Sequence, residues 1–408
     1  VRLTGADGNE VARVPELAFE LSLTALLRGT LAPSAVDLFG VRATVLRRPG
    51  TGITLALAGA ESSEPESEEG SLIGPMLEAL VSDGDRSSPL GYLRRLGIRN
   101  ADLRFVDEVN GLNFDAPEAN LVIYRGDGGL AGVLHAKFAI GDTLATLEMN
   151  GELPAGADEA NIEARVADLV PAALAQTAPS LSDYGIFDAP LFADGELRIG
   201  RDGAVRSGHL SIRAGAGEID LPAPWETSIP LEEAEGDITI DGLLQRIKVE
   251  RLAVKAGLHE ASLSGTLDYR VRKGLDISSI RTDLEVDGFH TEVPGFFVGP
   301  VDLEKAVLKA DIDFDALSAD IDELFVGAGG GGIRLSGKVT DAERSPMVKI
   351  RGEIEPMPFE ALKAIWPLPL AKGAREWVGK NLLGGTVDSG SFDIDLAPGA
   401  IADAADHV

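Results

Sequence analysis

Apolar residues recur at every second position over a long part of the chain, from about residue 197 to residue 339. Leu252 and Val254, then Leu263 and Leu267, show the pattern, and charged residues such as Lys255 stand between them. This alternation predicts strands that turn one face to water and the other to apolar material. The predicted fold is therefore mainly β, and the question of function becomes what covers the apolar face.

Further strands are predicted before and after this region, at residues 36–41, 54–58, 93–98, 101–106, 116–124, 130–140, 143–150 and 386–396. Helical spacing of apolar residues predicts short helical insertions near residues 72–81, 158–190 and 357–383. In the second of these, Ile162, Val166, Leu169 and Leu174 are spaced as on a helix face, and Pro171 is expected to kink or restart the helix.

The chain divides by composition into four expected parts. Residues 1–59 are a strand and helix segment, and residues 60–71 are an acidic, serine-rich stretch that is expected to be a mobile loop. Residues 72–190 form a first β section with a helical insertion. Residues 191–408 form a longer β section that ends in a helix pair containing tryptophans, which are expected to pack on the end of the sheet.

Charge and composition exclude several function classes. The net charge of −29 argues against nucleic acid as a partner, because phosphate binding needs concentrated Lys and Arg. The absence of cysteine excludes disulfides, thiolate nucleophiles and Cys-ligated metals. The sequence has no run of 18 apolar residues, so no transmembrane helix is predicted within it.

Two motifs resemble cofactor or metal sites, but their context is wrong. Gly327, Gly329 and Gly332 match a dinucleotide fingerprint, yet an alternating strand follows instead of the helix that would hold a pyrophosphate. The acids that begin at Asp311 follow a calcium-loop spacing, but Ala316 replaces the glycine that this loop requires. The five histidines are far apart and no nucleophile motif occurs. We expect no catalytic residues, no metal and no cofactor.

The most distinctive segment of the sequence resembles a known family. Its residues are Trp366, Pro367, Arg375, Glu376, Trp377, Val378, Asn381, Leu382, Gly385 and Val387. Together they resemble the central region of YhdP-type proteins of the AsmA-like (AsmA/TamB/YhdP) superfamily. Residues 11–17, 26–29 and 36–38 are similar to the juxtamembrane region at the start of such proteins. Residues 96–103 resemble the strand sequences that recur in them.

This resemblance implies a fold, a function and a location. It implies an elongated, twisted antiparallel sheet that is folded lengthwise into an apolar-lined groove. It implies bridge-like transport of phospholipid across the periplasm of Gram-negative bacteria, between the inner and outer membranes, without enzymatic chemistry. The implied partners are phospholipid acyl chains, the inner membrane through an N-terminal helix absent from this sequence, and envelope proteins.

The alternation supplies candidates for the groove lining. They are one-sided apolar residues of successive predicted strands: Leu252, Val254, Leu263, Leu267, Leu284, Val286, Ile312, Phe314, Ile333, Leu335, Val348 and Ile350. Two other functions stay open at this point. One is a structural β-solenoid or scaffold of the cell envelope without bound lipid, and the other is a glycan-active enzyme that uses acids from the loops.

Overall fold

A computed structural model describes residues 2–4, 10–13, 15–48, 52–57, 80, 89–108, 111–177, 179–200, 204–221, 227–273, 276–292, 296–341, 346–368 and 370–397. The fold is mainly β, with 69% strand and 11% helix, so the predicted fold class is confirmed. Within these residues, most strands belong to one long sheet that is not closed into a barrel. The sheet is mixed rather than purely antiparallel, because β4 (Pro33–Phe39) and β5 (Arg42–Arg48) both pair in parallel with β7 (Arg95–Asp107).

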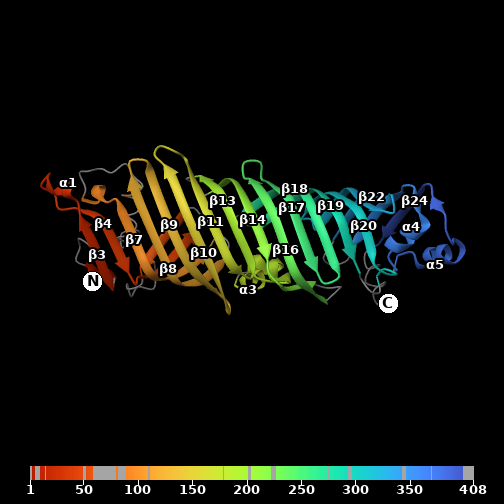
Figure 1. Cartoon of the computed structure of the whole chain (residues 1–408), viewed down its shortest axis with the longest axis horizontal. Coiled ribbons are helices and arrows are strands. Elements are labelled where there is room, and N and C mark those ends of the chain that lie inside the picture. The colour runs from red at the N-terminus through yellow and green to blue at the C-terminus, as the bar shows by residue number, and fades with distance from the viewer. Residues whose placement is uncertain are drawn as a thin grey trace. The chain divides into compact units, whose positions relative to one another are not determined.

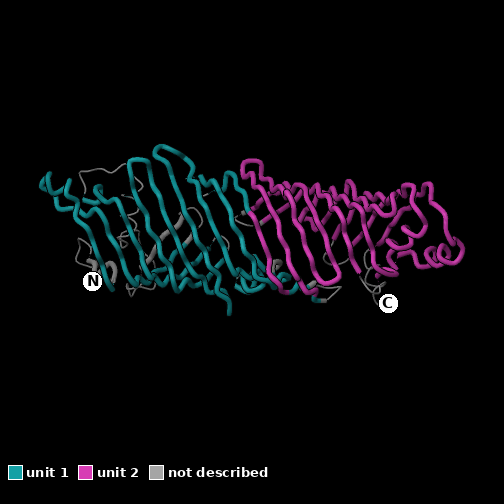
Figure 2. Tube along the Cα trace, in the orientation of Figure 1, with its two compact units in different colours: residues 1–210, 218–228 teal, residues 211–217, 229–408 magenta. Residues whose placement is uncertain are grey.

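The chain forms two compact units, coloured separately in Figure 2. Unit 1 contains residues 1–210 and 218–228, and unit 2 contains residues 211–217 and 229–408. No helix in the described part of the chain is both long enough and apolar enough to cross a membrane.

Unit 1 consists mostly of strands that pair with their neighbours in the sequence (Figure 1). Besides β4, β5 and β7, its strands are β1 Arg2–Thr4, β2 Glu10–Arg13, β3 Glu16–Leu21, β6 Gly52–Leu57, β8 Leu112–Gly126, β9 Gly129–Ile140, β10 Thr143–Pro154, β11 Glu159–Leu169, β12 Phe187–Asp188, β13 Leu191–Gly200 and β15 Gly217–Leu221. Strand β14 (Val205–Ala214), which lies between β13 and β15 in the sequence, contributes residues to both units. The helices of unit 1 whose full extent the structure describes are short: α1 Leu23–Leu26, the 3₁₀ helices η2 Pro89–Tyr92 and η3 Pro179–Ile186, and α3 Pro171–Ala175.

The first part of the predicted helical insertion at residues 158–190 is wrong, because Glu159–Leu169 form strand β11. Ile162 and Val166 are four residues apart, a spacing that fits both periods, but Ala160 and Ala164 complete an alternating pattern that small side chains made easy to overlook. Pro171 does start a helix, α3, since a proline in the first turn needs no hydrogen-bond donor. The predicted loop 60–71 lies outside the described residues, as does the predicted helix 72–81 except for Leu80, which is helical.

Unit 1 contains the largest fully buried core of the described residues. Leu38 of β4 and Leu96 of β7 lie at its centre, together with Leu80 and Leu93, which come from outside the strands. Partly buried side chains of β8 and β9, such as Leu121 and Leu134, extend the packing. Where β4, β5, β7, β8 and β9 meet, the chain itself covers the apolar side of its strands.

Unit 2 contains the end of β14 and most of β16 (Thr227–Asp241), and its later strands follow one another as antiparallel neighbours, apart from one short two-stranded sheet (Figure 1). They are β17 Arg246–Ala256, β18 His259–Lys273, β19 Asp276–Thr291, β20 Val301–Asp313, β21 Ser318–Ala328, β22 Gly331–Thr340, β23 Met347–Ile354, β24 Met357–Pro358, β25 Thr386–Val387 and β26 Gly390–Leu396. The glycines that match a dinucleotide fingerprint join β21 to β22, with Gly329 and Gly330 at positive φ in the turn. A strand follows these glycines, as the alternation predicts.

The predicted helix pair is present as α4 (Phe359–Ile365) and α5 (Lys372–Asn381). Leu362 and Ile365 of α4 are buried in a cluster with Val301, Ala328 and Met357, against which Trp366 packs. The expectation that the tryptophans pack on the sheet end is thus correct for Trp366 and wrong for Trp377, whose side chain is 59% exposed. The two differ because Trp366 directly follows the buried face of α4, whereas no residue of α5 is buried.

Candidate functional site

The pairing register of unit 2 aligns apolar residues of seven successive strands, β17 to β23, on one side of the sheet. Residues that face each other across a pair point to the same side. One row runs through Leu252, Leu263, Val286, Ala306, Val326, Ile333 and Ile354. Parallel to it run Leu284, Leu308, Leu324 and Leu335, and then Ile280, Ile312, Ala319, Val339 and Val348. We call these three rows, together with the row through Thr282 described below, the apolar face of unit 2.

The side chains of this face are mostly half-buried rather than buried. Leu263, Leu284 and Leu335 are each partly exposed in the described structure. A sheet that is covered by a second layer would bury such residues almost completely. Apolar area of this extent therefore remains available for contact with another apolar molecule.

Helix α4 covers one part of the face. Ile333 and Ile354 pack against the buried cluster that contains Leu362 and Ile365, and Val326 lies in the same contact. These three residues belong to one row, so α4 lies at the margin of the face where this row crosses β21, β22 and β23. The rows through Leu284 and Ile312 are not part of that cluster.

The structure brings most of the predicted lining residues together. Leu252, Leu263, Val286, Leu284, Ile312, Ile333, Leu335 and Val348 lie in the three rows above. Val254 pairs with Ala261, Leu267 with Thr282, and Ile350 with Gly337, on the same side. Phe314 is set apart, since it follows the end of β20 and is 43% exposed.

Sequence reasoning missed the contribution of β21. Its apolar side chains Ile321, Leu324 and Val326 belong to the face, but the strand was not predicted. The register shifts between Ile321 and Leu324, so two residues rather than one separate these side chains and the alternation is interrupted. Two half-patterns joined by a one-residue shift are the signal that would have revealed this strand.

One polar group lies within the apolar face. Thr282 sits in the row of Leu267, Ala310, Ile321 and Ile350 and is only 3% exposed. Its hydroxyl oxygen is buried, and no described residue forms a hydrogen bond with it. An unpaired buried hydroxyl destabilises a protein, so this position is a weak point of the face as it stands.

The opposite side of the same strands carries rows of paired charges. Arg246 donates two hydrogen bonds to Asp268, at 2.5 and 2.7 Å, and Arg281 donates two to Asp311, at 2.8 and 2.7 Å. These arginines hold the pKa of Asp268 and of Asp311 below the ordinary value, chiefly through the hydrogen bonds. Lys338 pairs with Asp320 at 2.9 Å on the same side. This polar side is well suited to contact with water.

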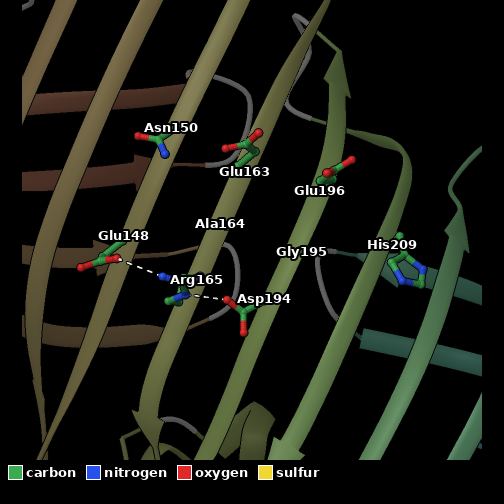
Figure 3. A pocket seen from close by; sticks show the side chains of 9 residues that line it. All are labelled: Glu148, Asn150, Glu163, Ala164, Arg165, Asp194, Gly195, Glu196 and His209. Atoms are coloured by element: carbon green, nitrogen blue, oxygen red, sulfur yellow. Dashed lines mark hydrogen bonds and ion pairs between the residues drawn. The ribbon is translucent and has the colours of Figure 1, made fainter.

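A polar surface pocket in unit 1, with a volume of about 410 Å³, is lined by residues of β10, β11, β13 and β14 (Figure 3). Arg165 lies between Glu148 and Asp194, and the hydrogen bond that Arg165 donates to Asp194 raises the pKa of the arginine. Ala164 and Gly195 face each other across β11 and β13, and they line the depression between the acids with their backbone, because their Cβ positions point to the other side of the sheet. The carboxylates of this pocket thus form cross-strand ion pairs like those on the polar side of unit 2.

The acids with calcium-loop spacing do not converge on one point. Asp311 pairs with Arg281, and the carboxylate of Asp313 accepts hydrogen bonds from the backbone of Asp315 and Ala316 at 2.9 Å. Asp322 lies in the next strand, β21. Within the described residues, no group of three acidic or histidine side chains is placed to hold a metal ion.

These features define a mainly β protein with an extended, half-exposed apolar face, backed by a polar side of paired charges. No protein-family model, curated protein or solved structure matches the chain significantly. The function is therefore argued from the geometry of the face.

Proposed function

We propose that this protein binds phospholipid acyl chains on the apolar face of unit 2 and moves phospholipid along the sheet, without catalysing a reaction. The observation that carries the proposal is that apolar side chains line one side of seven paired strands and, away from α4, remain partly exposed. A ligand for such a face must be long, apolar and tolerant of position, and acyl chains meet all three conditions.

The dimensions of the face fit this class of ligand. Seven strands separated by about 4.8 Å extend over roughly 29 Å, close to the hydrocarbon thickness of a bilayer, which accommodates two acyl chains end to end. Each buried methylene contributes about 0.8 kcal/mol, so a chain gains binding energy without a shaped pocket. Since Leu, Ile and Val repeat along the rows, neighbouring positions offer similar affinity, which favours movement along the face.

The resemblance to YhdP-type proteins of the AsmA-like superfamily supports the same proposal. It adds the expectation of a lengthwise groove, of a periplasmic location and of transfer between the inner and outer membranes. A structural sheet of the cell envelope that binds no lipid is the rival explanation. Lipid content distinguishes the two directly.

The first experiment purifies the protein from Gram-negative cells and measures its mass under native conditions, then extracts and identifies any lipid. Phospholipid released on denaturation is the expected result, and its headgroups name the cargo. A protein that carries no lipid and takes up no fluorescent phospholipid would contradict the proposal and favour the structural role.

The second experiment places charges on the face. In the variant Leu263→Asp plus Leu284→Asp, two carboxylates interrupt adjacent rows, and we expect lipid binding and transfer to fall at least tenfold, because burying a charge against acyl chains is unfavourable (about 1.4 kcal/mol gives a factor of ten). The matched control, Thr266→Asp plus Ser336→Asp, adds the same charges opposite Lys248 and Arg351 on the polar side. Circular dichroism verifies that both variants fold, and full transfer by the first variant would show that the face is not the lipid site.

A further inference from the structure

Helix α5 presents an apolar side chain to solvent on an element that shares no core with the sheet. Trp377 is 59% exposed, and Leu383, just beyond the helix, is 86% exposed. None of the ten residues of α5 is buried, whereas the preceding helix α4 buries Leu362 and Ile365. Tryptophan is enriched at contact surfaces, where one part of its ring is apolar and its N–H is polar, so Trp377 together with Leu383 indicates a contact surface.

A second exposed apolar segment is tied to the linker between the helices. The backbone amide of Leu368 donates a hydrogen bond of 2.7 Å to the carbonyl oxygen of Phe296. Phe296 and Val298 are themselves exposed. This bond joins the segment that carries Phe296 to the polypeptide that leads into α5.

The charge of α5 is opposite to that of the chain as a whole. The helix contains three basic residues, Lys372, Arg375 and Lys380, and one acid, Glu376, which gives it a net charge of +2. The whole protein carries −29. Lys372 and Lys380 are exposed, and Glu376 lies 3.9 Å from Lys380 without cancelling the excess.

We propose that α5 docks on the surface of a membrane that contains anionic phospholipids. The tryptophan ring has an apolar body and a polar N–H, which suits the boundary between headgroups and acyl chains. Lys380, three residues after Trp377 on the same side of the helix, reaches phosphate oxygens while its stem stays in contact with the apolar layer, and Lys372 adds positive charge at the start of the helix. An amphipathic helix of this kind lies in the interface plane rather than crossing the bilayer.

The acidic remainder of the chain makes this docking directional. At physiological salt, electrostatic forces act over about 8 Å, so acids far from α5 contribute little once the helix is at the surface. Acidic faces of the protein are repelled when they approach the same membrane. The positive charge of α5 thus favours this helix as the point of approach in a chain that is acidic as a whole.

This inference goes beyond the proposed function and is tested separately from it. The binding site named here is the helix, and the lipid site named above is the apolar face of the sheet. The variant Leu263→Asp plus Leu284→Asp leaves α5 intact, so it keeps binding to vesicles even where it loses lipid transfer.

The test measures co-sedimentation of the whole chain with vesicles of phosphatidylcholine, and with vesicles in which roughly one third is replaced by phosphatidylglycerol. We expect binding to the anionic vesicles, weaker at high salt, and little binding to the neutral ones. Lys372→Glu plus Lys380→Glu should lower the binding constant at least about fivefold, since each basic residue near an anionic surface contributes about that factor. Trp377→Ser should lower it at least about threefold, because apolar contact is lost.

Matched controls come from the same unit. Lys338→Glu changes an exposed lysine on the polar side of the sheet, and Leu244→Ser removes an exposed apolar side chain from the turn between β16 and β17. Neither should weaken binding to vesicles. In a Trp225→Phe plus Trp366→Phe variant, Trp377 is the remaining fluorophore, and its emission should shift to the blue on anionic vesicles.

Three results would overturn the docking proposal. One is the absence of binding to anionic vesicles, and another is an equal loss of binding in the control variants. The third is self-association of the protein that Trp377→Ser abolishes while vesicles have no effect, which would assign α5 to a contact between copies of this chain.

Discussion

The core of unit 1 and the apolar face of unit 2 are built from the same alternating strands, yet they differ in what covers them. In unit 1, Leu38 and Leu96 are almost completely buried, and Leu80 and Leu93 from outside the strands complete the core. In unit 2, Leu263 and Leu284 are half-exposed, and α4 covers only the margin near Ile333. Alternation thus determines which side of a strand is apolar, while the segments between strands determine whether that side is sealed.

The largest expected effect compares one leucine from each region. Leu96→Ala should lower the free energy of unfolding of unit 1 by about 3 kcal/mol, because a fully buried leucine leaves a cavity. Leu284→Ala should cost unit 2 only about 1 kcal/mol, since part of that side chain already contacts solvent.

Hydrogen exchange followed by mass spectrometry measures this difference, because peptides of β7 and β19 report on the two units separately. A single unfolding midpoint would not do so for a chain with two units. Equal losses in the two variants would mean that the face of unit 2 is sealed after all.

A smaller effect is expected at Thr282, the buried hydroxyl of the apolar face. Thr282→Val keeps the shape of the side chain and removes the unpaired oxygen, so unit 2 should become more stable by about 1 kcal/mol. Protection of β19 against hydrogen exchange measures the gain. The control is Thr266→Val, on the polar side of the neighbouring strand β18, and it should give no gain in stability. A clear loss of stability in Thr282→Val would show that the hydroxyl has a hydrogen-bond partner.

The smallest effect concerns pH and the paired charges of unit 2. Arg246 lowers the pKa of Asp268 below the ordinary value of 3.8, so this pair stabilises the fold at pH 7. Its contribution is present above that ordinary value and is lost as the pH falls through the lowered pKa of the folded state. Because the pair is partly exposed, we expect no more than about 1 kcal/mol.

The comparison of wild type with Asp268→Asn tests this sign. The variant should be less stable at neutral pH, and the difference should vanish in strong acid, where both side chains are uncharged. Asp388→Asn, in the loop before β26, is the control. A difference that persists unchanged in strong acid, below the lowered pKa of folded Asp268, would contradict the ionic origin.

Much of the fold could be predicted from the sequence, because a strand with one solvent-exposed side alternates apolar and polar residues with a period of two. The strands of Leu263 and Leu284 and the helix pair with Trp366 were predicted in this way, and the structure confirms them. Strand β11 was mistaken for a helix where alanines hid the alternation. Strand β21 was missed where a bulge shifts the pattern between Ile321 and Leu324.

The candidate site was predictable in part, for a different reason. Residues within one strand reveal their side from the sequence alone, so Leu252 and Leu335 were identified as lining residues. Their alignment into rows depends on the pairing register between strands, which the alternation within a single strand does not specify. The exposure of Trp377 depends on how α5 is held, and nothing in the helical spacing distinguishes it from Trp366.

The row of charges from Arg246 through Asp268 and Arg281 to Asp311 also bears on how the sheet assembles. A slip of one residue would turn leucines outward and is rejected at once. A slip of two residues keeps every leucine on its proper side, and hydrophobic burial alone barely opposes it. That slip would place Asp268 opposite Asp283 or Ser279 instead of Arg281, so the arginine would lose its neighbour. During folding, the ion pairs therefore disfavour a two-residue shift in strand register, which burial of the apolar side does not disfavour.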